Sequence, residues 1–149
     1  MLLGILLSTF AFAGELYQEC EWETVPSIEI CPDSKLEIVD IVESLTYWSK
    51  RGVKINISGI YNVDYCDLEK VNVIQISGYR NFDNKNYHAM TNIDWYYYDE
   101  KSSSQSIFID RVLVQIPNNK INKEIIVLHE IGHAFGLGHS HDSIMKENH

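Results

Sequence analysis

The chain has 149 residues, a formal net charge of −9 at neutral pH and 45% hydrophobic residues. A chain of this length can bury the core of one domain, and we expect a single domain without internal repeats. The acidic balance argues against a nucleic-acid partner and against anionic membrane surfaces, because both attract lysine and arginine.

The first thirteen residues, MLLGILLSTFAFA, form an uncharged and mostly apolar run that ends in small residues. This pattern is typical of a secretory signal peptide, and we predict cleavage after Ala13. A membrane span needs about 20 apolar residues, so this run is too short for one. We therefore expect a secreted or periplasmic protein with no stable membrane association after cleavage.

Residues 14–34 are irregular in pattern, because Pro26 and Pro32 interrupt any long element. We predict that this segment is an N-terminal arm, or a strand clipped to the body of the protein. The remaining residues, 35–149, are expected to form one domain.

Cys20, Cys31 and Cys66 make an odd number of cysteines for an exported chain. The simplest prediction is one disulfide and one free thiol, with Cys20 and Cys31 as the natural local pair. In the alternative hypothesis, a cysteine of the arm binds a metal as a thiolate and keeps the site latent.

Helical and strand patterns follow in turn along the rest of the chain. Apolar residues at helical spacing, closed by Gly52, predict an amphipathic helix over residues 35–51, capped by Asp33 or Ser34. Two-residue alternation or β-rich composition predicts four strands, at 53–60, 71–79, 88–98 and 106–116, with an exposed loop at 101–105. A last helix is expected over residues 122–135, with Asn122 as its cap.

The last helix carries the pattern H-E-x-x-H. His129 and His133 are four residues apart, so a helix projects both from one face toward a common ion. Glu130 lies one residue further round, where its carboxylate can reach a water on that ion without binding the metal. Alone, this pattern is only moderately specific.

The residues that follow raise the specificity. Gly136 allows the chain to turn out of the helix, so that His139 can swing back toward the same ion, and Met145 follows six residues later. The sequence here resembles the metzincin zinc endopeptidases, whose pattern H-E-x-x-H-x-x-G-x-x-H precedes a Met-turn, and is most similar to the matrixin branch.

This resemblance implies an α+β fold with a mixed, mostly parallel twisted sheet, a backing helix and an active-site helix. A zinc cleft would lie below the edge strand, where an extended peptide substrate binds; residues 87–93 are the candidate edge. Met145 would form a floor beneath the metal. Three neutral imidazoles, His129, His133 and His139, would hold one catalytic Zn²⁺ with an open position for water.

The chemistry expected at such a site is peptide hydrolysis. Zinc lowers the pKa of a bound water to about 7 in favourable cases, and Glu130 would act as general base and later protonate the leaving amine. We therefore predict a secreted zinc metalloendopeptidase. The structural zinc and calcium loop of matrixins is not recognisable in the sequence, so we predict neither of those ions.

Two alternatives remain open at the sequence level. His141, two residues beyond His139, could close the zinc shell, which would favour a structural site. The protein would then be a secreted, non-catalytic binding module with a structural or vestigial zinc site. His88 and His149 are interpreted as residues without a role in the site.

Overall fold

The computed structural model describes residues 18–78, 89–98, 106–119, 124–140 and 144–146. In chain order the elements are β1 (Glu21–Trp22), β2 (Ser27–Ile30), α1 (Ile38–Lys50), β3 (Ile60–Asn62), β4 (Val73–Ser77), β5 (Met90–Tyr98), β6 (Ser106–Gln115) and α2 (Glu124–Ala134). The expected signal peptide and the expected loop at 101–105 lie outside the described residues. No helix within these ranges is long and apolar enough to cross a membrane.

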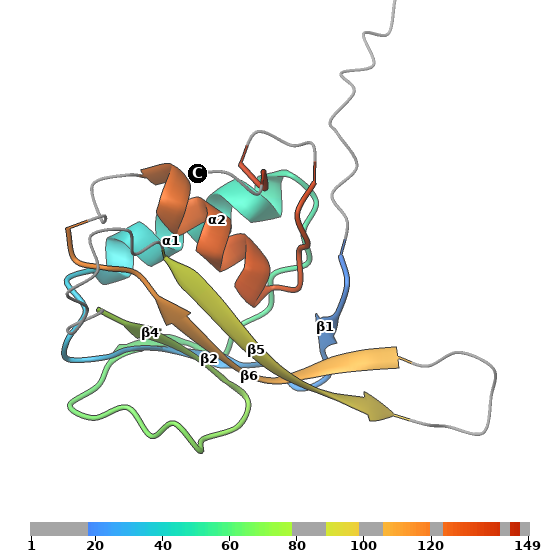
Figure 1. The fold of residues 1–149 in the computed structure, drawn as a ribbon, viewed down its shortest axis with the longest axis horizontal. Coiled ribbons are helices and arrows are strands. Elements are labelled where there is room, and N and C mark those ends of the chain that lie inside the picture. The colour runs from blue at the N-terminus through green and yellow to red at the C-terminus, as the bar shows by residue number, and fades with distance from the viewer. Residues whose placement is uncertain (1–17, 79–88, 99–105, 120–123, 141–143, 147–149) are drawn as a thin grey trace, which may run out of the picture.

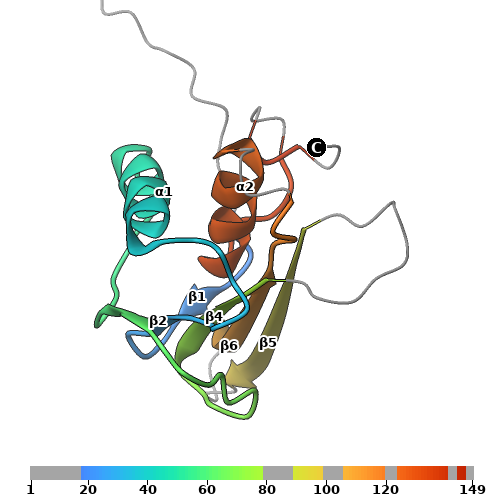
Figure 2. The ribbon, with the colours of Figure 1, turned by 90° about the vertical axis from the view of Figure 1, so that its left-hand side faces the viewer.

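All six strands join one sheet, and both helices lie on the same face of it (Figures 1 and 2). The strand order is β5-β6-β4-β2-β3, and β1 pairs with β6 beside the part that pairs with β4. Only β5 and β6 are antiparallel. The predicted α+β fold with a mixed, mostly parallel sheet is confirmed, and the predicted edge strand is β5, at least from Met90 onward.

Helix α1 begins at Ile38, three residues later than the predicted start at residue 35. The preceding residues are held by other bonds: the side chain of Asp33 accepts from Ser77, and the amide of Lys35 donates to Asn118. The helix starts instead where the amide of Glu37 donates to the carboxylate of Asp40 across the first turn, at 2.7 Å.

The strand predicted over residues 53–60 is wrong in its position, because the third strand of the chain lies at Ile60–Asn62 and shares only residue 60 with it. Val53 is nevertheless buried, and Ile55 and Ile57 pack against the core. The alternation of apolar residues therefore reflects alternate burial of an extended segment, while pairing with β2 begins only after Gly59.

Residues 27–30, in the segment predicted to be an arm or a strand clipped to the body, form β2, which lies inside the sheet between β3 and β4. Pro26 and Pro32 flank this strand and do not interrupt it. Its one charged side chain, Glu29, is 6% exposed and accepts hydrogen bonds from Lys70 and Gln75. These donors make the burial of a carboxylate tolerable.

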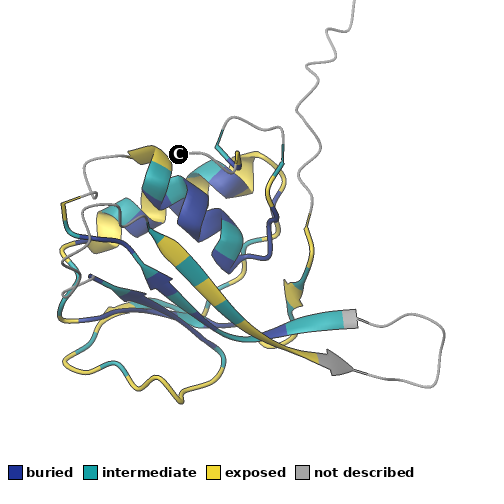
Figure 3. Cartoon of the chain, viewed as in Figure 1, coloured by how far each residue is buried: buried dark blue, intermediate teal, exposed yellow. Residues whose placement is uncertain are grey.

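Tight packing on the helical face holds α2 in place. Trp48 of α1 is fully buried, and its indole N–H donates to the carbonyl of Leu128 in α2 at 2.8 Å. Ile131 projects from α2 into the same core as Ile74 and Val114 of the sheet. Figure 3 shows that this face of α2 and the central strands are buried, whereas β5 is mostly exposed or half-buried.

The connection between β3 and β4 covers the other face of the sheet (Figure 1) and is tied down by a disulfide. That disulfide joins Cys31 to Cys66, and Cys20 is a free thiol. The predicted Cys20–Cys31 pair is therefore wrong. Cys31 follows the end of β2, so its side chain faces the same side as Glu29, toward this connection.

We predict that Cys66→Ala, combined with Cys31→Ala, lowers the free energy of unfolding by about 3 kcal/mol, because the bond closes a loop with a sequence separation of 35. Circular dichroism melting would measure this as a fall in Tm. Cys20→Ala is the matched control and should leave the disulfide intact. A peptide map that joined Cys20 to Cys31 would contradict the assignment.

Candidate metal centre

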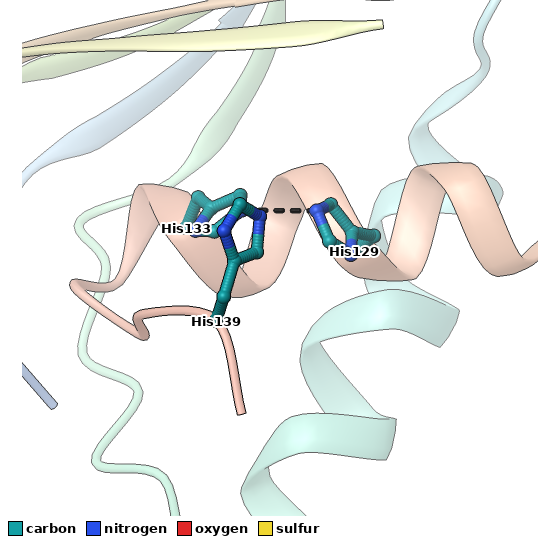
Figure 4. A group of neighbouring side chains, drawn as sticks. All are labelled: His129, His133 and His139. Atoms are coloured by element: carbon teal, nitrogen blue, oxygen red, sulfur yellow. Dashed lines mark hydrogen bonds between the residues drawn. The ribbon is translucent and has the colours of Figure 1, made fainter. Parts of the chain in front are cut away.

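Helix α2 spans Glu124–Ala134, so its described start is two residues later than predicted, and Asn122 lies outside the described residues. His129, Glu130 and His133 are on this helix. Gly136 follows its end with a φ of +84°, a left-handed conformation that favours glycine. The turn brings His139 back beside the helix (Figure 4).

Three imidazoles converge at this point. The Nε2 atom of His133 lies 3.0 Å from Nε2 of His129 and 3.2 Å from Nε2 of His139. Zinc–nitrogen bonds of about 2.0–2.1 Å at tetrahedral angles would separate ligand nitrogens by about 3.3 Å. The observed spacing is close to that value, so the three nitrogens can reach one ion.

Backbone carbonyls determine which nitrogen of each helix histidine faces the others. Nδ1 of His129 lies 2.7 Å from the carbonyl oxygen of Ile144, and Nδ1 of His133 lies 2.6 Å from that of Leu137. A carbonyl can only accept, so we assign the proton of both neutral rings to Nδ1. Each Nε2 atom then presents a lone pair.

The arrangement of these lone pairs indicates whether the histidines suit a metal ion. Two bare nitrogens 3.0 Å apart repel each other unless a cation lies between them. Burial lowers the pKa of His133 to about 4, against the opposing effect of its bond with Leu137, so this ring is neutral at physiological pH. Neutral imidazoles with oriented Nδ1–H groups are the form that zinc binds.

Glu130 has a partner that sequence reasoning missed. The hydroxyl of Thr91, on the edge strand β5, lies 2.5 Å from Oε2 of Glu130 and 3.1 Å from the backbone carbonyl of the same residue. Burial raises the pKa of the Glu130 carboxyl, and the hydrogen bond from Thr91 opposes that shift. A single threonine within a strand gives no sequence signal for this contact.

Met145 is fully buried. A Cβ atom built on Gly132 would lie 2.8 Å from the sulfur of Met145 and 3.0 Å from the ring of Trp48. The amide of Ser140 donates to the carbonyl of Met145 at 3.0 Å. Glycine at position 132 therefore allows the methionine to lie directly against the helix.

No cysteine belongs to the group of converging ligand atoms formed by the described residues. The sulfur of Cys20 lies beside Gly136, and burial followed by the charge of Glu19 raises the pKa of its thiol. A thiol in this state is protonated at neutral pH and is a poor ligand. His88, His141 and His149 lie outside the described residues.

Three imidazoles converge from a helix and its following turn, next to the edge strand of a mixed sheet, and could hold one metal ion. The family model for the matrixins, peptidase family M10, matches residues 65–149, which is more than half of the chain. The chain belongs to this family of zinc metallopeptidases. A search of curated proteins gives no match.

We predict that purified protein binds about one zinc per chain, and that His139→Ala lowers the zinc affinity by at least tenfold, because a three-nitrogen site loses one ligand. Elemental analysis and competition with a chromogenic chelator would measure content and affinity. His88→Ala, outside the motif, is the control. Unchanged zinc affinity in His139→Ala would refute this ligand assignment.

Proposed function

We propose that this protein is a secreted zinc-dependent endopeptidase in which His129, His133 and His139 bind the metal and Glu130 is the general base. The observation that carries the proposal is the convergence of three Nε2 atoms, two of them on the helix that also carries the buried Glu130. Bound zinc would supply a Lewis acid that polarises the peptide carbonyl and makes water acidic. Met145 would support the ligands from below.

Glu130 would hold and move the proton. Its carboxylate accepts the proton of the attacking water and later passes it to the leaving amine. The hydrogen bond from Thr91 keeps one carboxylate oxygen occupied, which fixes the direction of the other. Burial raises the pKa of the carboxyl and so makes it a stronger base, while Thr91 stabilises the ionised form.

The substrate would be an extended peptide or protein segment lying along β5. Among the described residues, β5 pairs with β6 on one side only. Its other side offers backbone donors and acceptors to an added strand, next to the residue that contacts Glu130. Backbone pairing of this kind would align a peptide beside the metal site largely independently of its sequence.

We expect Glu130→Ala to keep its zinc and to lose peptide cleavage by a factor of about 10² to 10⁴, because the general base is gone. His133→Ala should lose both. Cleavage of a mixed peptide library, with and without a chelator, would measure this, and Glu124→Ala at the exposed start of α2 is the control. Full activity in Glu130→Ala would exclude the mechanism; zinc binding without cleavage in the wild type would favour a binding module.

Thr91→Val should reduce kcat by roughly tenfold and change KM little, because the isosteric side chain keeps the packing and loses one charged hydrogen bond. Thr91→Ser should restore most of the rate. Steady-state kinetics on one cleaved peptide would separate kcat from KM, and zinc content should be the same in all three proteins. Equal rates in the valine and serine variants would rule out a positioning role.

A further inference from the structure

The C-terminal end of α2 is held by residues from the other end of the chain. The last carbonyls of a helix have no partners within it. Here the carbonyl of Ala134 accepts from the indole N–H of Trp22 at 2.9 Å, and that of Phe135 accepts from the side-chain amide of Gln18 at 3.1 Å. The amide of Glu19 donates to the carbonyl of Gly136 at 2.8 Å.

The contact continues into the turn that follows the helix. Gln18 forms an antiparallel bridge with Leu137, and the side chain of Glu19 lies against Gly138. A Cβ atom on Gly136 would overlap the backbone carbonyl of Cys20. Gly136 therefore serves two needs, since it provides the left-handed turn and leaves room for the N-terminal backbone.

The same turn carries the metal-site geometry. It links His133 to His139, and the carbonyl of Leu137 orients the ring of His133. The N-terminal residues that contact this turn continue into β1, where residues 21–22 pair with β6 at Phe108 and Ile109. Residues 18–22, which we name the N-terminal clamp, thus tie the turn to the sheet.

We propose that the N-terminal clamp is part of the metal centre: it holds the turn that carries His139, so zinc affinity depends on it. Proteolytic trimming of the chain beyond this segment would then release the metal. Trp22 and Gln18 act through the turn and are positioning residues. The inference rests on the proposed zinc site but not on peptide cleavage.

The test uses the full-length protein with Trp22→Phe, which keeps a ring and removes the N–H donor, and Gln18→Ala, which removes the amide donor to Phe135 from an exposed residue. Competition with a chromogenic chelator measures zinc affinity, and the visible spectrum of the Co²⁺-substituted protein reports ligand geometry. Trp95→Phe, at a tryptophan that is 50% exposed on β5, is the matched control.

Trp22→Phe should bind zinc roughly tenfold more weakly, Gln18→Ala several-fold more weakly, and both should alter the Co²⁺ spectrum, as outer-shell substitutions at metal sites do. Trp95→Phe should match wild type. Zinc affinities within twofold of wild type in both clamp variants would overturn the inference. A wild-type protein that bound zinc but cleaved no peptide would refute the peptidase proposal and leave this measurement valid.

Discussion

The carbonyl oxygens of Leu137 and Ile144 determine how the helix histidines face one another. Each accepts from an Nδ1 atom and so turns the opposite nitrogen toward the common point. Neither carbonyl belongs to α2. The chain must therefore turn sharply at Gly136 to bring Leu137 to His133, and must return past His139 to bring Ile144 to His129. The spacing of the motif after the second histidine follows from this requirement.

The helix itself is fixed by packing on three sides. Trp48 of α1 packs against Gly132 and bonds to the carbonyl of Leu128, Met145 lies against the same glycine, and Thr91 of β5 bonds to Glu130. A larger residue at position 132 would separate α2 from both Trp48 and Met145. The catalytic geometry proposed above thus depends on small residues as much as on the histidines.

The parts of this structure that local patterns encode could be predicted from the sequence. The H-E-x-x-H spacing requires only one helix, and the strands at 73–77, 90–98 and 106–115 are long or strongly alternating. Features that depend on distant partners could not be predicted. The charged Glu29 makes β2 hard to predict as a buried strand, since the Lys70 that neutralises it is 41 residues away. The disulfide partner of Cys31 likewise lies beyond a helix and a strand.

The strand wrongly placed at 53–60 shows the limit of the alternation itself. Val53 and Ile57 face the core as they would in a strand, but none of the described strands pairs with that backbone. Thr91 and Trp22 illustrate the same limit within the candidate site, because each acts through one hydrogen bond to a residue far along the chain. Such contacts form only in the folded chain, so the sequence pattern alone does not indicate them.

The region that matches the matrixin model begins at residue 65, yet several determinants of the metal centre precede it. Trp48 supports α2 from one side, and the N-terminal clamp satisfies three carbonyls at and just beyond its end. The proposed ligands and the proposed base lie within the matched region, whereas part of the scaffold that sets their spacing does not. The motif therefore indicates the chemistry of the site. The affinity for metal depends in addition on residues outside the motif, through hydrogen bonds that form only in the folded chain.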